Sequence, residues 1–154
     1  MNRNTKFVAA AIAVVSMLIL GTSTLCSWAI AHGASPKWRL AFRMMCHGIE
    51  SRCLTLFGVP MPICARCTAI YVGLIAGILL FMVLPAIEER AMRVALYVAV
   101  APMAIDGLTQ ATHLRESTNV LRLITGFIAA VAFSCWALNE VEGTKHTIEG
   151  SLPS

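Results

Sequence analysis

Four stretches of the chain consist almost entirely of apolar residues, and charged or turn-forming residues bound each of them. The stretches cover about residues 7–30, 68–87, 92–108 and 120–138. Because a helix of roughly 20 apolar residues crosses the hydrocarbon core of a bilayer, the pattern predicts four transmembrane helices. Pro102 interrupts the third stretch, where a membrane helix tolerates a kink. Either Ser117 or Thr118 is placed to cap the fourth helix.

The first stretch has a second interpretation, as a cleaved secretion signal. Arg3 and Lys6 precede it, and Ala29-Ile30-Ala31 is similar to a small-residue cleavage site. Its run of about 24 residues exceeds the roughly 7–15 residues of a signal core, which favours a retained helix. The chain then divides into residues 1–31 with the N-terminal transmembrane helix, a core over 32–138 with three transmembrane helices, and a polar, mobile tail over 139–154.

Composition supports the membrane assignment. Hydrophobic residues make up 58% of the chain and charged residues only 13%, which excludes a soluble domain with a polar shell and a disordered chain. The net charge of +4 comes from scattered lysines and arginines, so nucleic acid is not an expected partner. Membrane lipid is the expected partner, and the sequence does not identify protein partners.

Four spans place the first and third connections on the same membrane face. These connections and the adjoining helix ends contain most of the reactive and charged side chains. Seven of the twelve lysines and arginines lie on this face, so the positive-inside rule favours a cytoplasmic location for it. This excess of positive residues disappears if Arg52, Arg66 and Arg122 serve a function and are left out of the count.

Cysteines form the most specific motif on this face. Cys64 and Cys67 form a Cys-x-x-Cys at the start of the second apolar helix, where the helix dipole favours thiolates. The adjacent Cys46 and His47 are a second half-site, and Gly48 permits the sharp turn that neighbouring ligands need. The predicted metal ligands are Cys46, His47, Cys64 and Cys67. Zinc is favoured because thiolate and imidazole are its usual ligands.

Other interpretations of these cysteines stay open. Cys64 and Cys67 also fit a redox dithiol, and the cysteines could be inert. On an extracytoplasmic face, a disulfide from Cys64 to Cys46 or Cys53 becomes the leading interpretation. The preceding residues 38–57 mix apolar with charged side chains and are too charged to span, so we expect an interfacial or re-entrant segment.

A polar cluster is predicted beside the cysteines. Asp106 and Gln110 share a helical face, and Arg122 lies within the fourth apolar stretch, where a charge needs a partner or water. One interpretation is structural, with Asp106 or Glu116 pairing with Arg122 to join the last two helices. The other is an anion site for a lipid phosphate or carboxylate, with an acid as base or cation ligand. The predicted cluster consists of Arg52, Arg66, Asp106, Gln110, Arg115, Glu116, Asn119 and Arg122.

Several motifs occur together in this chain. They are Cys46-His47, Arg52, Cys64-Ala65-Arg66-Cys67 followed by Ile70-Tyr71-Val72-Gly73, Asp106-Gly107-Leu108-Thr109-Gln110, and residues 115–126. Over roughly residues 44–138 the chain resembles a bacterial and archaeal family of small predicted membrane proteins catalogued as a domain of unknown function. Ala69 stands where glycine is commoner in that family. The resemblance implies a helical membrane fold and a single site made of both polar sets, and it implies no reaction.

The sequence therefore predicts an all-α polytopic membrane protein with about four transmembrane helices and a metal site, with zinc favoured, on one face. Three functional classes stay open beside simple metal binding. A membrane enzyme acting on a lipid or polyprenyl anion would need a metal with an open position. A transporter or metal-handling protein would need mobile thiols along a path. A structural or assembly factor would use the metal to hold the first loop to the second helix.

Overall fold

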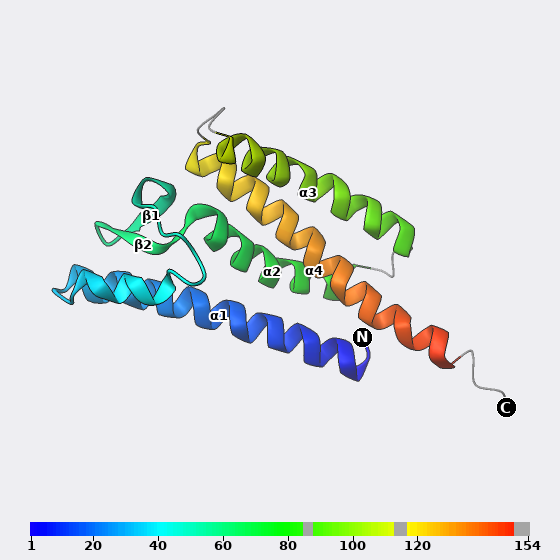
Figure 1. The fold of residues 1–154 in the computed structure, drawn as a ribbon. Helices are drawn as coiled ribbons and strands as arrows, with labels where there is room; N and C mark the ends of the chain where they lie inside the picture. Colours follow the sequence, from blue (N-terminus) through cyan, green and yellow to red (C-terminus); the bar gives the residue numbers. More distant parts are fainter. Residues whose placement is uncertain (85–87, 113–116, 150–154) are drawn as a thin grey trace.

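The computed structural model describes residues 1–84, 88–112 and 117–149, and within them it contains four long helices and one β-hairpin (Figure 1). The helices are α1 (Arg3–Ala31), α2 (Ala65–Val83), α3 (Glu89–Ala111) and α4 (Asn119–Glu149). Each is long and apolar enough to cross a membrane, α4 over Asn119–Gly143. The prediction of a helical membrane fold with four spans is confirmed. The tightest packing joins α2 to α4, and α3 packs on α4.

The last helix is longer than the apolar stretch that predicted it, because α4 continues past Leu138 to Glu149. The polar residues beyond the apolar run have partners in the fold. The Glu142 carboxylate accepts hydrogen bonds from the Asn2 backbone N–H at 3.0 and 3.1 Å. Arg93 Nε lies 3.5 Å from Glu140 Oε1. Hydropathy marks where the apolar run stops, whereas these contacts with α1 and α3 support further helical turns.

The connection between α1 and α2 contains two short 3-10 helices, η1 (Pro36–Phe42) and η2 (Glu50–Arg52), and an antiparallel hairpin of β1 (Cys53–Leu56) and β2 (Val59–Cys64). Nothing in the apolar pattern predicted the hairpin, and the two prolines of β2 argue against a strand. A two-stranded sheet tolerates them because one edge of β2 is unpaired. Met61 and Ile63 are buried against Ile19 and Leu20 of α1, so the hairpin is held by its apolar side chains.

Figure 1 shows the hairpin, the start of α2, the end of α3 and the start of α4 at one end of the bundle, with the start of α1 and the end of α4 towards the other end. The helix ends that adjoin the first and third connections therefore lie on one side, as the prediction of a shared face requires. A direct contact links them, since Asn119 Nδ2 donates to the Ser51 carbonyl at 3.4 Å. Thr118 caps α4, because its hydroxyl oxygen accepts from the Leu121 N–H at 3.3 Å.

Two glycines one turn apart allow α2 and α4 to pack closely. A Cβ atom at Gly73 would lie 2.7 Å from the Phe127 carbonyl oxygen, and one at Gly77 would lie 2.7 Å from the Ser134 Cβ. Such contacts are shorter than atoms tolerate, so both positions require glycine. Small residues at a helix interface bring backbones together in membranes. The Gly-x-x-x-Gly motif thus fixes the position of α2 against α4, and with it the position of the first turn of α2.

Gly73→Ala is expected to lower the free energy of unfolding by about 1–3 kcal/mol, as overpacked cores do. Gly21→Ala in α1 is the matched control, because a Cβ at Gly21 meets no atom within 4 Å. Since alanine favours helix over glycine, the control should be neutral or stabilising. Equilibrium unfolding in detergent micelles measures both. Equal stability of the two variants would contradict the packing argument.

Candidate metal centre

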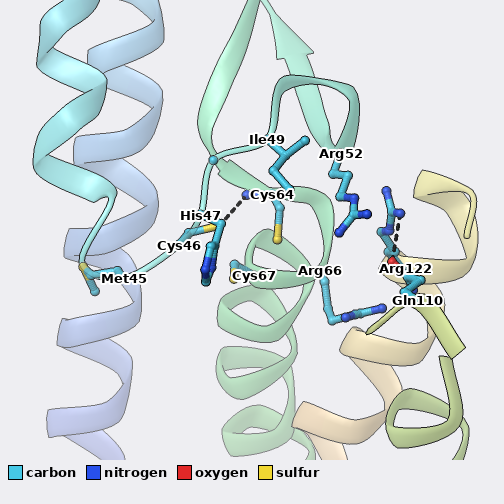
Figure 2. Close-up of a pocket in the computed structure, with 11 residues that line it drawn as sticks. Met45, Cys46, His47, Ile49, Arg52, Cys64, Arg66, Cys67, Gln110 and Arg122 are labelled. Atoms are coloured by element: carbon cyan, nitrogen blue, oxygen red, sulfur yellow. Dashed lines mark hydrogen bonds between the residues drawn. The ribbon is translucent and has the colours of Figure 1, made fainter. Parts of the chain in front are cut away.

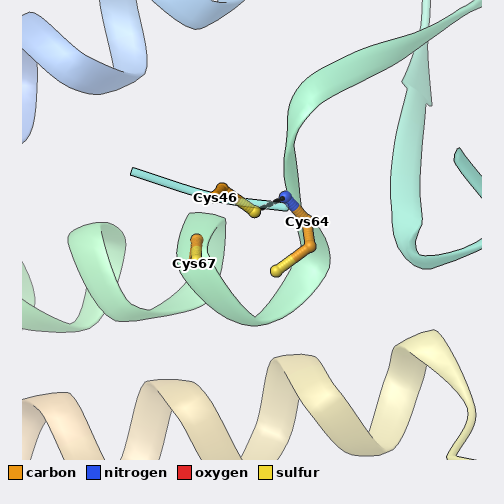
Figure 3. Close-up of side chains that lie close together, drawn as sticks. All are labelled: Cys46, Cys64 and Cys67. Atoms are coloured by element: carbon orange, nitrogen blue, oxygen red, sulfur yellow. Dashed lines mark hydrogen bonds between the residues drawn. The ribbon is translucent and has the colours of Figure 1, made fainter. Parts of the chain in front are cut away.

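Three cysteines from different segments meet at the start of α2. Cys46 lies in the loop after η1, Cys64 is the last residue of β2, and Cys67 is in the first turn of α2. Their sulfur atoms all lie within 4.8 Å of one another (Figure 3). Three sulfurs that bind one zinc ion at about 2.3 Å are about 3.8 Å apart in a tetrahedral site. The three thiols could therefore hold a metal ion after a small contraction.

Backbone geometry brings Cys46 to the other two cysteines. The Cys64 backbone N–H donates to the Cys46 sulfur at 3.2 Å. The chain turns at Gly48, which has a φ of +57°, and a Cβ there would lie 3.3 Å from the Pro62 carbonyl oxygen. Left-handed backbone conformation and close approach both favour glycine. The sharp turn predicted after Cys46 and His47 is confirmed.

The cysteines of this region differ in their tendency to form thiolates. A hydrogen bond from the Cys67 thiol lowers the pKa of Cys64, with further contributions from Cys46 and backbone N–H groups, although burial opposes them. Burial is the main cause that raises the pKa of Cys53 to about 11. The Cys53 thiol donates to the Ile49 carbonyl at 3.2 Å. Cys64 is thus suited to ionise and Cys53 is not. All six cysteines of the chain are among the described residues, and all are free.

His47, the fourth predicted ligand, lies beside the three sulfurs without joining them. Its side chain is exposed and lines the same cavity. Within the described parts of the chain, the cluster of potential metal ligands consists of the three cysteines alone. The thiols therefore form the preorganised part of the site.

A cavity of about 370 Å³ opens beside the sulfurs. Its lining consists of Met45, Cys46, His47, Gly48, Ile49, Arg52, Cys64, Arg66, Cys67, Gln110 and Arg122. Figure 2 shows Cys46, Cys64 and Cys67 on one side of it and the guanidinium groups of Arg52, Arg66 and Arg122 on the side towards α3 and α4. The cysteine motif and half of the predicted polar cluster, namely Arg52, Arg66, Gln110 and Arg122, therefore share a cavity.

Asp106 is 6% exposed and forms an ion pair with Arg66. The sequence indicated Arg122 as a partner of Asp106, whereas the ion pair joins α3 to Arg66 of α2. Gly126 makes room for Arg66, because a Cβ there would lie 3.0 Å from the Arg66 carbonyl oxygen and 3.2 Å from its Cγ. Gly126 was the signal in the sequence that could have identified this pair.

Arg122 is held by neutral amides. Its Nη2 donates to Gln110 Oε1 at 2.9 Å and its Nη1 to Asn119 Oδ1 at 3.0 Å. Gln110 in turn donates from Nε2 to Asp106 Oδ2 at 2.8 Å. A continuous network thus runs from Arg66 through Asp106 and Gln110 to Arg122. Of the predicted polar cluster, the structure brings together Arg52, Arg66, Asp106, Gln110, Asn119 and Arg122, and Arg115 and Glu116 lie outside the described residues.

Comparison with known proteins places this arrangement in a family. The family described as "Predicted membrane protein (DUF2085)" matches residues 46–136. An uncharacterized protein of Methanocaldococcus jannaschii is 40% identical over 90 residues, which are 57% of this chain and 58% of that protein. An uncharacterized protein of Methanothermobacter thermautotrophicus is 36% identical over 95 residues, 62% of this chain and 86% of that protein. No solved structure matches the chain.

This chain therefore spans only 58% of the length of its Methanocaldococcus relative. The matched region begins at the first cysteine of the cluster and includes α2, α3 and most of α4. It contains every described residue of the cavity except Met45. Since the match covers more than half of the chain and both halves of the site, the chain belongs to the DUF2085 family of predicted membrane proteins.

Proposed function

We propose that this membrane protein binds a zinc ion through Cys46, Cys64 and Cys67, with a fourth coordination position open to the cavity. The observation that carries the proposal is the convergence of three sulfur atoms within 4.8 Å of one another. Soft thiolate ligands in a tetrahedral arrangement suit zinc. A redox dithiol uses only two thiols, whereas here a third cysteine is brought in from a separate loop.

The open fourth position favours a binding or reactive centre over a purely structural one. Structural zinc sites usually have four protein ligands, whereas catalytic sites have three and leave one position for water or substrate. The fourth position faces a cavity of about 370 Å³ lined by arginines. A zinc ion that only holds chain segments together does not need such a cavity. Of the classes that the sequence left open, a membrane enzyme acting on an anionic lipid fits this arrangement best. The proposal also places the cluster on the cytoplasmic side, where thiols stay reduced.

Elemental analysis of the full-length protein, purified in detergent under reducing conditions, tests the metal. We expect stoichiometric zinc in the wild type and its loss in Cys64→Ser, because two sulfurs without the third bind far more weakly. Cys53→Ser is the matched control from the same loop region. Its thiol donates to the Ile49 carbonyl and lies outside the cluster, so this variant should keep its zinc.

His47→Ala is also expected to keep the zinc, because the His47 ring lies outside the three-sulfur cluster. Loss of zinc from this variant would show that His47 is the fourth ligand and that no coordination position is open. Metal-free wild-type protein with Cys64 and Cys67 joined in a disulfide would overturn the metal proposal in favour of a redox dithiol. Zinc retained in both Cys64→Ser and Cys46→Ser would place the metal elsewhere in the chain.

A further inference from the structure

The cavity beside the cysteines is lined by more positive charge than the carboxylates among the described residues compensate. Three guanidinium groups, from Arg52, Arg66 and Arg122, line it. Within the described part of the chain, no carboxylate is among the lining residues. Asp106 lies behind Arg66, forms its ion pair with that side chain and also accepts a hydrogen bond from Gln110. The wall facing the thiols is therefore cationic.

Arg122 is buried, and it forms no ion pair with any residue that the structure describes. Its residue is 5% exposed, and its described partners are the neutral amide oxygens of Gln110 and Asn119. A buried guanidinium without a counter-ion is unfavourable, because it loses its hydration without gaining an opposite charge. Among the residues described, Arg52 also forms no ion pair. Both side chains therefore have unused donors that face the cavity.

The proposed zinc does not remove this excess. A zinc ion with three thiolates carries one negative charge, and Asp106 carries another, whereas the three arginines carry three positive charges. Counted over the described residues, one positive charge is left over in a site with an open metal position. An anion that reaches both the metal and the arginines would neutralise it.

We propose that the cavity binds a phosphate-type oxyanion, held by Arg52 and Arg122 and directed at the open position of the zinc. The metal contact rests on the proposed function, whereas the arginine contacts do not. Arginine suits this ligand because its fork of N–H donors matches the oxygens of a phosphate. Among the described residues, Gln110 and Asn119 use two of the five N–H donors of Arg122, which leaves three for the anion. A volume of about 370 Å³ is in the range of small-molecule sites, roughly 300–1,000 Å³.

Gln110 and Asn119 act as positioning residues in this proposal. They come from α3 and from the first turn of α4, and each holds one terminal nitrogen of Arg122. The guanidinium is thus oriented before a ligand arrives, which lowers the entropic cost of binding. Arg52 approaches from η2 on the hairpin side, so the two arginines come to the cavity from different segments (Figure 2).

Binding of inorganic phosphate to the full-length, zinc-loaded protein, measured by equilibrium dialysis, tests the proposal. Arg52→Gln is expected to weaken binding about tenfold or more, the loss of one charge-assisted hydrogen bond. Because Arg52 is half-buried and has no ion pair among the described residues, this variant should fold. Arg43→Gln is the control, since Arg43 is exposed in the same connection and does not line the cavity.

The source of the phosphate group is tested in parallel with nanodiscs that contain phosphatidic acid in a phosphatidylcholine background. Retention of phosphatidic acid that depends on Arg52 and Arg122 identifies a lipid headgroup, and dialysis binding without lipid retention identifies a free phosphate. Either result supports the oxyanion site. Binding of both probes by Arg52→Gln and Arg122→Gln at the wild-type level would overturn it, as would failure of the wild type to bind either probe.

The metal-free Cys64→Ser variant separates the two proposals. If it still binds phosphate more weakly than the wild type and with the same dependence on Arg52, the zinc contributes a contact and both proposals hold. If the wild type contains no metal but binds phosphate through Arg52, the zinc proposal fails and the arginine site stands. If zinc is present and Arg52→Gln changes nothing, the oxyanion site fails alone.

Discussion

Asp106→Asn is expected to lower the free energy of unfolding by about 3–5 kcal/mol, the cost of removing one partner from a buried ion pair. Asp106 is 6% exposed and is the described partner of the Arg66 guanidinium. Asparagine keeps the size and one acceptor but removes the charge. The Arg66 Nε atom is already buried without a hydrogen-bond partner, so the side chain has little other compensation among the described residues.

The same substitution disturbs the neighbouring helices. Gln110 donates to the Asp106 carboxylate and accepts from Arg122. Weakening the first bond releases the amide that positions Arg122 on α4. We therefore expect phosphate binding to fall together with stability in Asp106→Asn, although Asp106 itself does not line the cavity.

Two variants check the assignment, with unfolding in mixed micelles followed by circular dichroism. Asp106→Asn/Arg66→Met removes both charges and should recover much of the lost stability, because a buried pair replaced by uncharged residues is often close to neutral. Glu89→Gln removes the carboxylate that pairs with Arg93 at 2.9 Å, where both side chains are about half exposed. That exposed pair should contribute about 1 kcal/mol or less. Equal losses in Asp106→Asn and Glu89→Gln would contradict a buried pair.

The sequence predicts those features of the fold that depend on local composition. Four apolar runs predict four helices, and their number places the cysteines and the polar cluster on one face. The turn at Gly48 follows from the need of adjacent ligands for a sharp bend. The spacing of Gly73 and Gly77 predicts a closely packed face on the second helix, and the structure shows that α4 packs there.

Features that depend on tertiary packing could not be predicted. Helical periodicity shows that Asp106 faces a neighbour, but the choice between Arg66 and Arg122 depends on how closely Gly126 lets α2 and α4 approach. The hairpin is held by burial of Met61 and Ile63 against α1, a contact that no local pattern reports. The end of α4 depends on partners at the N-terminus and in α3.

Removal of the proposed zinc with a chelator is expected to speed amide hydrogen exchange at least tenfold in the loop that contains Cys46, and to leave the middle of α2 and α4 unchanged. The metal would join three segments, so its binding energy is part of the folding energy of the loop. The Cys64 amide is the sharpest probe, because it donates to the Cys46 sulfur. The helices have their own packing at Gly73 and Gly77 and do not depend on the metal.

The Cys64→Ser variant supplies the control for this experiment, because a chelator has no site to empty there and should leave its exchange unchanged. Peptides from the loop and from α4, followed by mass spectrometry in the same sample, give the contrast directly. Faster exchange in all four helices would mean that the metal stabilises the whole bundle. No change in the loop would mean that the hairpin and the backbone turn at Gly48 hold Cys46 in place without a metal. The three thiols would then form their site before the metal binds, and the metal would not be needed to order the loop.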